Sequence, residues 1–279
     1  MRLGRAFARA LVLAAALALP AAANSAEPPP AEPLLPEPLL IVGDSAYPPY
    51  AYLDRNGEPA GVYVEILREA LARLPGHPAR IELIPWKRAL RAVETGTATA
   101  VFPPYRWTEQ RPWMEYSEPI LTETLVVVCR REVPGLDVRG YPEGFAGLRF
   151  VNNLGFLGAG PGLLRMVAAG TVGMVEVPGT PEAVQRLLDG RADCTVNDRL
   201  AVEAALASLE VGASAADKLV VAGEVSRADG HLGYRKGDAS PAVAAFRTAL
   251  DQVLRDMKRE GRIDALLHRR RPGVALQGR

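Results

Sequence analysis

Short apolar runs and amphipathic helical patterns alternate along most of the chain. Residues 39–44 (LLIVGD) are typical of a buried strand, and residues 61–74 (GVYVEILREALARL) place apolar side chains at helical spacing. A strand at 80–86, a helix at 87–96 and a strand at 98–102 follow. This alternation predicts a mostly parallel sheet with flanking helices.

A second series of the same kind begins after residue 145. Its predicted strands and helices lie at 148–153, 161–170, 180–190, 194–198 and 199–209. Thr180 is expected to cap its helix. Extended runs near 121–130 and 219–236 join the two series, and a long helix is predicted over 240–261. The pattern predicts two α/β lobes, and the last helix could complete either of them.

The N-terminus has the organisation of a secretory signal peptide, which we assign to residues 1–26. Three arginines precede the run LVLAAALAL, which is too short for a stable membrane span, and small residues follow it. An uncleaved anchor is the alternative. Residues 27–38 are proline-rich and predict an extended linker. We therefore expect a soluble protein in the periplasm.

The amino-acid composition and net charge exclude some classes of function. The 279 residues are 48% apolar and 23% charged, with a formal net charge of +1. This balance argues against nucleic-acid binding, which needs a concentrated basic surface. Two cysteines and three scattered histidines offer no metal-ligand spacing, so neither a metal nor another cofactor is expected.

Five segments occur in the order found in one family. They are YPPYAYLDRNGEPAGVYVEILREAL, WKRALRAVETGTATAVF, RPWMEYSEPI, LDGRADCTVNDRLAVEAAL and HLGYRKGDASPAVAAFRTALDQVLRDMKREGRIDALL. From about residue 39 to about residue 270 the chain resembles the periplasmic solute-binding proteins of the polar amino-acid type, family 3. The resemblance implies the type II two-lobe α/β fold, with ligand bound between the lobes and a hinge of two strands.

The resemblance also implies a domain order. The first lobe comprises residues 39–125 and 226–272, the second lobe comprises 126–225, and 273–279 form a tail. In the resembled fold the strands that carry Cys129 and Cys194 are antiparallel neighbours, so the two thiols are expected to pair. Two separate buried thiols are the alternative.

Aromatic residues of the first lobe match positions that face the ligand in this family. Tyr47 corresponds to the aromatic that packs on the ligand, although it could instead hold its proline-rich turn. Trp86 either lines the pocket or packs beneath it. Phe102 and Tyr105 belong to the loop FPPYRWTEQR, in which two prolines remove backbone N–H donors that the family normally offers.

The same loop holds two candidate anchors for a carboxylate. Arg111 falls at the family's carboxylate-binding arginine when counted from Thr99, but a one-residue deletion precedes EYSEP. Arg106 replaces a small hydroxyl residue and is the rival cation. A planar guanidinium suits a carboxylate because it donates two parallel hydrogen bonds. Either arginine could instead be a solvated surface charge.

The second lobe offers polar partners. Asp198 corresponds to the acid that holds a ligand's amino group, and it could also cap the helix that follows. Asn153 is one of the few polar groups left where NNLGFLGAGPG replaces the family's usual helix entry.

These assignments predict a monomeric binding protein without enzymatic activity. It captures a small polar solute, an amino acid or related carboxylate, and delivers it to the membrane permease of an ABC importer. A ligand sensor for a membrane signalling partner is an alternative with the same cleft. An enzyme of the periplasmic dehydratase type is another, but no catalytic residues were found.

Overall fold

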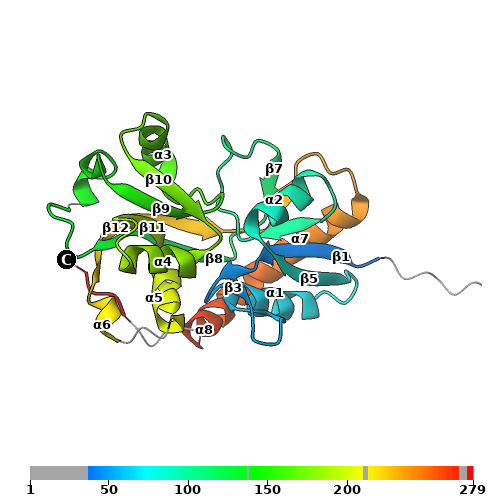
Figure 1. Ribbon diagram of the computed structural model, residues 1–279. Coiled ribbons are helices and arrows are strands. Elements are labelled where there is room, and N and C mark those ends of the chain that lie inside the picture. The colour runs from blue at the N-terminus through cyan, green and yellow to red at the C-terminus, as the bar shows by residue number, and fades with distance from the viewer. Residues whose placement is uncertain (1–36, 137, 210–212, 270–274, 279) are drawn as a thin grey trace, which may run out of the picture. The chain divides into compact units, whose positions relative to one another are not determined.

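Two five-stranded sheets dominate the computed structural model, which describes residues 37–136, 138–209, 213–269 and 275–278. The signal peptide assigned to 1–26 and all but the last two residues of the linker lie outside the described residues. Figure 1 shows the two sheets and the helices beside them. None of the described helices is both long and apolar enough to cross a membrane.

The first lobe has the strand order β5-β1-β6-β13-β7. These strands are β1 (Leu39–Asp44), β5 (Ala79–Ile84), β6 (Ala100–Phe102), β7 (Met114–Tyr116) and β13 (Gly233–Arg235). β1 pairs in parallel with β5 and β6, whereas β13 pairs antiparallel with β6 and β7. A small second sheet is formed by β2 (Ala46–Tyr47), β3 (Ala51–Leu53) and β4 (Pro59–Ala60).

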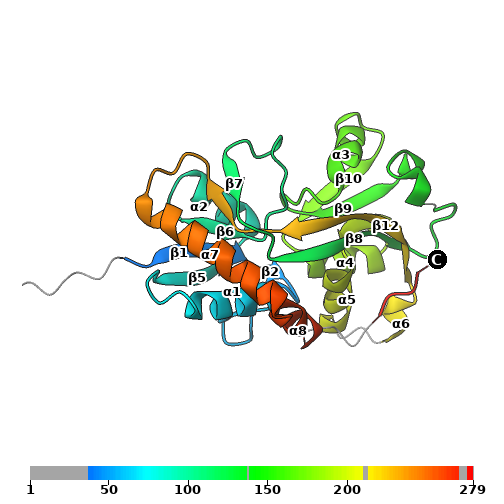
Figure 2. The same cartoon turned by 180° about the vertical axis from the view of Figure 1, so that it is seen from behind.

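Four helices cover this lobe: α1 (Val62–Ala72), α2 (Trp86–Glu94), α7 (Pro241–Arg259) and α8 (Arg262–Arg269). The buried side chains of α1, α7 and α8 share one core with Ile41 of β1. The next residue of β1, Val42, faces the opposite core beneath α2, because successive strand residues point to opposite faces. Figure 2 shows α7 and α8 beside α1, so the last helices complete the first lobe.

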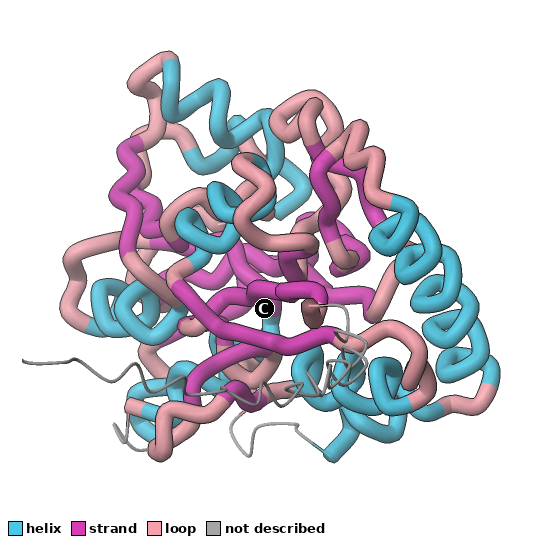
Figure 3. Tube along the Cα trace, turned by 90° about the vertical axis from the view of Figure 1, so that its right-hand side faces the viewer, coloured by secondary structure: helices cyan, strands magenta, loops and turns pink. Residues whose placement is uncertain are grey.

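The second lobe has the strand order β10-β9-β11-β8-β12. Its strands are β8 (Leu121–Arg130), β9 (Arg149–Asn153), β10 (Gly173–Val177), β11 (Cys194–Asp198) and β12 (Leu219–Gly230). Its helices are α3 (Gly160–Ala168), α4 (Thr180–Leu188), α5 (Arg199–Ser208) and α6 (Ala213–Ala216), with short 3₁₀ turns at Val138–Gly140 and Glu143–Phe145. β8 is buried on both faces between two cores, and Figure 3 shows the helices around the strands.

The strands β8 and β12 connect the lobes. They pair antiparallel from Leu121 opposite Gly230 to Arg130 opposite Leu219, with two register shifts in β12. The predicted fold class is therefore confirmed, although each sheet is mixed, with parallel pairs at one edge and antiparallel pairs at the other.

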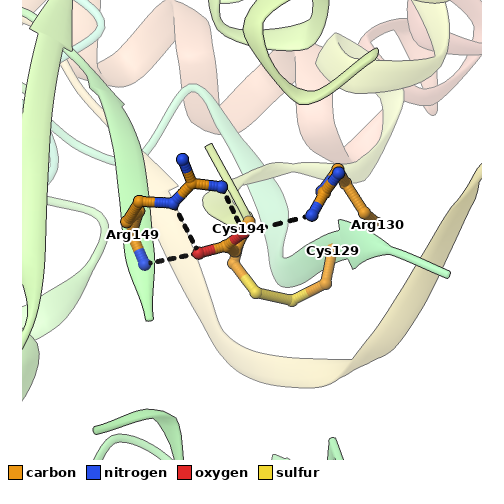
Figure 4. The surroundings of a disulfide bond; sticks show 5 residues. Cys129, Arg130, Arg149 and Cys194 are labelled. Carbon is orange, nitrogen blue, oxygen red and sulfur yellow. Dashed lines mark hydrogen bonds and ion pairs between the residues drawn. A yellow bond between two sulfur atoms is a disulfide. The ribbon is translucent and has the colours of Figure 1, made fainter. Parts of the chain in front are cut away.

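A disulfide joins Cys129 of β8 to Cys194 of β11, in agreement with the predicted pairing. The two residues lie directly opposite each other in the antiparallel register, with their Cα atoms 4.0 Å apart. Figure 4 shows the bridge beside Arg130 and Arg149, whose guanidinium groups both pair with the carboxylate of Asp193.

One local expectation was wrong. Thr180 is the first residue of α4 and not its cap, which is Gly179, because the Thr180 hydroxyl is engaged by two asparagine amides. Within the predicted tail, residues 275–278 are described by the structure. Leu276 is buried in a core of the second lobe, and its N–H donates to the carboxylate of Glu203.

Candidate functional site

A pocket lies between the two lobes. Its described walls are Asp44, Tyr47, Trp86 and Pro103 of the first lobe and Asn153 and Phe156 of the second. The free space between these walls is about 20 Å³, room for little more than a water molecule, and it opens to solvent. Asp44 ends β1, Asn153 ends β9, and Pro103 directly follows β6. The pocket thus lies at the carboxyl ends of parallel strands, where open α/β sheets commonly bind ligands.

Asp44 is the one carboxyl group among the described residues that line the pocket. Its side chain is 7% exposed, and its carboxylate accepts a hydrogen bond from the Ala46 N–H at 3.0 Å. Burial raises the pKa of Asp44 from its ordinary value of 3.8 to about 6, although backbone hydrogen bonds oppose the shift. At pH 7 the pocket therefore carries a negative charge.

Asn153 lines the pocket from the other lobe. Its Nδ2 donates to the Thr180 hydroxyl at 2.9 Å, which fixes the amide in place. Its Oδ1 is buried and has no hydrogen-bond partner. An unpaired buried acceptor is costly, so a donor on a bound molecule would relieve that cost.

A buried acid lies behind the aromatic wall. Glu123 of β8 is 1% exposed and accepts hydrogen bonds from the hydroxyl groups of Tyr47, Tyr63 and Tyr105, the last at 2.6 Å. Burial is the main cause that raises the pKa of Glu123 from 4.5 to about 8, and the charge of Asp198 adds to it. Tyr47 therefore faces the pocket while its hydroxyl is committed to Glu123.

Asp198 also lies between the lobes, and its hydrogen-bonding capacity is already used. It caps α5 by accepting from the Ala201 N–H, and it accepts from the Thr124 N–H and the Tyr50 hydroxyl at 3.0 and 2.9 Å. Burial raises the pKa of Asp198 to about 6, while these hydrogen bonds lower it. The Tyr50 contact joins the first lobe to the second.

A further contact between the lobes forms at the Gly155 carbonyl. This oxygen accepts from Trp86 Nε1 at 3.3 Å and from the Arg111 guanidinium at 3.4 Å. The guanidinium also lies 5.5 Å from the Trp86 ring centroid, a cation–π distance. Beside it, the exposed pair Lys87 and Glu176 spans the lobes at 3.3 Å.

Among curated proteins, none matches this chain in sequence. The family model of the bacterial extracellular solute-binding proteins, family 3, matches residues 39–269. The chain belongs to this family.

Solved structures with the same fold include binding, sensing and enzyme-related proteins. A mutant of ArgBP from T. maritima is 21% identical, with a TM-score of 0.66 over 83% of this chain and 94% of that one. A histidine kinase sensor domain with similarity to periplasmic binding proteins is 20% identical, with a TM-score of 0.68 over 86% of this chain and 98% of that one. The ancestral amino acid-binding protein AncCDT-1, a precursor of cyclohexadienyl dehydratase, is 21% identical, with a TM-score of 0.64 over 84% of this chain and 95% of that one.

Three of the residues predicted for ligand binding meet at the pocket of this family 3 protein: Tyr47, Trp86 and Asn153. Trp86 lines the pocket and also belongs to the core beneath α2. Asp198 and Arg111 lie close by, but neither lines this pocket. Asp198 has the helix-capping role that the sequence left open.

The remaining predicted residues lie in different places, and none of them lines this pocket. Phe102 is fully buried in the first-lobe core against Tyr63. Tyr105 donates to Glu123 behind the pocket. Arg106 is exposed, lies 5.5 Å from the Tyr116 ring centroid, and borders a different hollow with His231.

Asp44, Phe156 and Glu123 were missed by sequence reasoning. Asp44 had a usable signal, because an acid at the carboxyl end of a buried strand, three residues before Tyr47, stands where such sheets bind ligands. Glu123 lies between two threonines at the polar start of β8, where nothing marks it as buried. Phe156 gave no local signal, since its contact with Tyr105, with ring centroids 5.5 Å apart, exists only when the lobes meet.

Proposed function

We propose that this protein captures a small polar solute between its lobes and delivers it to the permease of an ABC importer. The observation that carries the proposal is the pocket whose walls come from both lobes. A solute that touches both sets of side chains favours the closed arrangement through that differential contact. We further propose that the chain is exported to the periplasm by its N-terminal segment and acts as a monomer.

A thermal-shift screen of amino acids, small carboxylates and amines tests solute capture. A solute that binds the native state at 100 times its Kd should stabilise it by about 2.7 kcal/mol. Trp86→Leu should abolish this stabilisation because Trp86 lines the pocket. Trp113→Leu is the matched control, since Trp113 packs against the same first-lobe core outside the pocket. Failure of every solute to stabilise the protein would contradict capture.

Two alternatives use the same pocket. A sensing role is supported by the likeness in fold to a histidine kinase sensor domain, and neighbouring genes would separate a sensor kinase from a permease and its ATPase. An enzymatic role is supported by Asp44, because a pocket carboxyl with a raised pKa is a candidate acid or base. Conversion of a bound solute, followed by chromatography, would replace the binding proposal.

A further inference from the structure

We propose that a hollow beside the connecting strands is a second ligand site, separate from the interlobe pocket, and that it holds a small oxyanion. Its described walls come from residues 105–107, from residues 226–229 of β12, and from Pro119 and His231. The free space is about 360 Å³, within the usual range for small-molecule sites. The inference goes beyond solute capture, because it concerns a different surface of the protein.

The hollow lies where the connecting segments leave the first lobe. Pro119 comes just before β8, and residues 226–229 belong to β12. None of the described residues that line the hollow also lines the interlobe pocket. Tyr105 contacts both regions, because it borders the hollow while its ring centroid lies 5.5 Å from that of Phe156 in the pocket wall. The two sites are therefore neighbours with separate walls.

The first support is a guanidinium group without an acidic partner. Arg106 is exposed, lines the hollow and forms no ion pair with any described residue. Its guanidinium carbon lies 5.5 Å from the Tyr116 ring centroid, a contact that leaves the N–H groups free. A planar guanidinium donates two parallel hydrogen bonds to a carboxylate or phosphate. Arg106 thus offers the fork that an oxyanion requires.

The second support is an excess of donors and of positive charge around the same space. Arg227 donates through its Nε to Glu224 at 3.2 Å, and its terminal nitrogens have no partner among the described residues. The Ser226 hydroxyl has no such partner either. Asp229 is the one carboxyl among the described lining residues, and its Oδ1 accepts from the Thr122 hydroxyl at 2.6 Å. Two guanidinium groups against one carboxylate favour an anion.

The third support is the unused nitrogen of a buried histidine. His231 is 2% exposed, and its Nδ1 donates to the Ser117 carbonyl at 2.8 Å, since a carbonyl oxygen can only accept. Nε2 has no hydrogen-bond partner among the described residues. The ring packs edge-on against Tyr116, with centroids 5.6 Å apart. The described charged side chains that act on the ring are Arg106, Asp229 and Lys258.

An oxyanion in the hollow should raise the pKa of His231. In the free protein burial lowers this pKa below its ordinary value of 6.5, so the ring is neutral at pH 7.5. A nearby negative charge favours the protonated ring, whose Nε2–H can donate to the anion. Binding is therefore coupled to proton uptake, and the anion should bind more tightly at pH 6 than at pH 8.

NMR of the histidine rings with sulfate, acetate and chloride tests the proposal. Of the three histidines in the chain, His231 lines the hollow, whereas His77 and His268 lie elsewhere and serve as internal controls. We expect sulfate or acetate to shift the His231 signals saturably and to raise the pKa of its ring. A response to acetate alone identifies a carboxylate, and a response to sulfate alone identifies a tetrahedral oxyanion. No saturable shift with either anion, or an equal shift with chloride at the same ionic strength, overturns the proposal.

A charge-removing variant tests the assignment to Arg106. Arg106→Gln should weaken binding of the effective anion by about tenfold or more, because it removes a hydrogen bond between charged groups. Arg55→Gln is the matched control, since Arg55 is an exposed arginine of the first lobe that does not line the hollow. Equal affinities for the two folded variants overturn the proposal. The wild-type comparison of sulfate, acetate and chloride remains decisive even where Arg106→Gln fails to fold.

Failure of this inference and failure of the proposed function give different results. Trp86→Leu alters the interlobe pocket and leaves the hollow intact, so the anion should still shift His231 in this variant. If the anion loses its effect in Trp86→Leu but keeps it in Arg106→Gln, it occupies the interlobe pocket, and the second site falls while capture stands. If no solute stabilises the protein but sulfate or acetate shifts His231 and requires Arg106, capture falls and the second site stands.

Discussion

Single side chains place buried ionisable groups at the junction of the lobes. Glu123 is buried near the start of β8, and three tyrosine hydroxyls converge on its carboxyl. Each of these tyrosines has its pKa raised well above 10 by burial and by Glu123, so the hydroxyls keep their protons and act as donors. The hydrogen bonds of this tyrosine cluster therefore depend on the protonation state of Glu123, which links the stability of the protein to pH.

We expect Glu123→Gln to flatten the pH dependence of stability. The pKa of Glu123 is about 8 in the folded protein and 4.5 ordinarily, so the native state keeps a proton that the unfolded chain releases. The free energy of unfolding should therefore fall as pH rises through this window, and each pKa unit corresponds to about 1.4 kcal/mol. Gln cannot titrate. Thermal unfolding at pH 6 and pH 8.5 measures the difference.

Glu109→Gln controls for the loss of a carboxyl, because Glu109 is exposed. It should retain the wild-type fall in Tm between the two pH values. A fall in Glu123→Gln as large as in wild type would show that Glu123 does not titrate in this window.

Asp44 predicts a pH dependence of ligand binding. Its pKa is about 6, and a protonated carboxyl no longer attracts a cation. The affinity for a solute that carries an amino group should therefore be constant above pH 7 and fall toward pH 5, approaching a tenfold loss per pH unit. Calorimetry at pH 5, 6 and 7.5 measures this fall. In Asp44→Asn the weaker affinity should not change with pH, and a persisting pH dependence would assign it to another group.

At the scale of elements, the loop at 153–157 forms the contact across the pocket. Gly155 has φ +77°, a conformation that side chains rarely adopt, and a Cβ at this position would lie 3.1 Å from Lys87 Cγ. Gly155→Ala should thus destabilise the protein by about 1 kcal/mol and also weaken ligand binding by displacing the loop. Thermal unfolding and calorimetry measure the two effects.

Gly237 provides a matched control. It has the same φ of +77°, but open space surrounds the position of its Cβ. Gly237→Ala should lower stability by a similar amount while the affinity for ligand stays unchanged. If both variants lose affinity equally, the loop at 153–157 has no special part in binding.

The disulfide stabilises the second lobe by joining its strands β8 and β11. Cys129 and Cys194 are 65 residues apart in sequence. Restricting a loop of this length in the unfolded chain contributes about 4 kcal/mol. The double variant Cys129→Ser and Cys194→Ser should lose stability of this order in urea unfolding, and reductant should lower the wild-type midpoint but not that of the variant. Two free thiols in the unreduced wild type would contradict the pairing.

Long elements were predictable because their patterns are local. The helix predicted over 61–74 forms at Val62–Ala72, and the one predicted over 240–261 forms at Pro241–Arg259 with Ser240 as its cap. The short strands β2, β3, β4 and β7 have two or three residues each. Such strands leave no periodicity, so tertiary pairing alone specifies them.

The site could be predicted only in part. Tyr47 and Trp86 were placed by family motif, whereas Asn153 was chosen as a remaining polar group where the chain departs from the family's pattern; all three side chains lie at the pocket. The sequence did not decide whether Arg106 or Arg111 is the carboxylate anchor, because the direction of a long side chain depends on its neighbours. Arg106 lies by Tyr116, and Arg111 lies by Trp86.

For the whole molecule, few polar contacts among the described residues join the lobes apart from the tyrosine cluster at Glu123 on the connecting strand β8. Tyr50 donates to Asp198, and Trp86 and Arg111 donate to the Gly155 carbonyl at 3.3 and 3.4 Å. The Lys87–Glu176 pair is exposed and contributes little, as surface ion pairs generally do. Closure in the absence of ligand should therefore be weak, and a ligand that contacts both walls should shift the population toward the closed state.

Small-angle scattering tests this shift directly. The radius of gyration should fall when a solute found by the thermal-shift screen saturates the protein, because the open population is lost. In Gly155→Ala the decrease should require a higher ligand concentration, since the loop that meets Trp86 is displaced. Gly237→Ala should follow the wild type. A radius that stays constant while calorimetry shows saturation would mean that the ligand binds without drawing the lobes together. Capture by closure would then be excluded, even though the pocket itself is occupied.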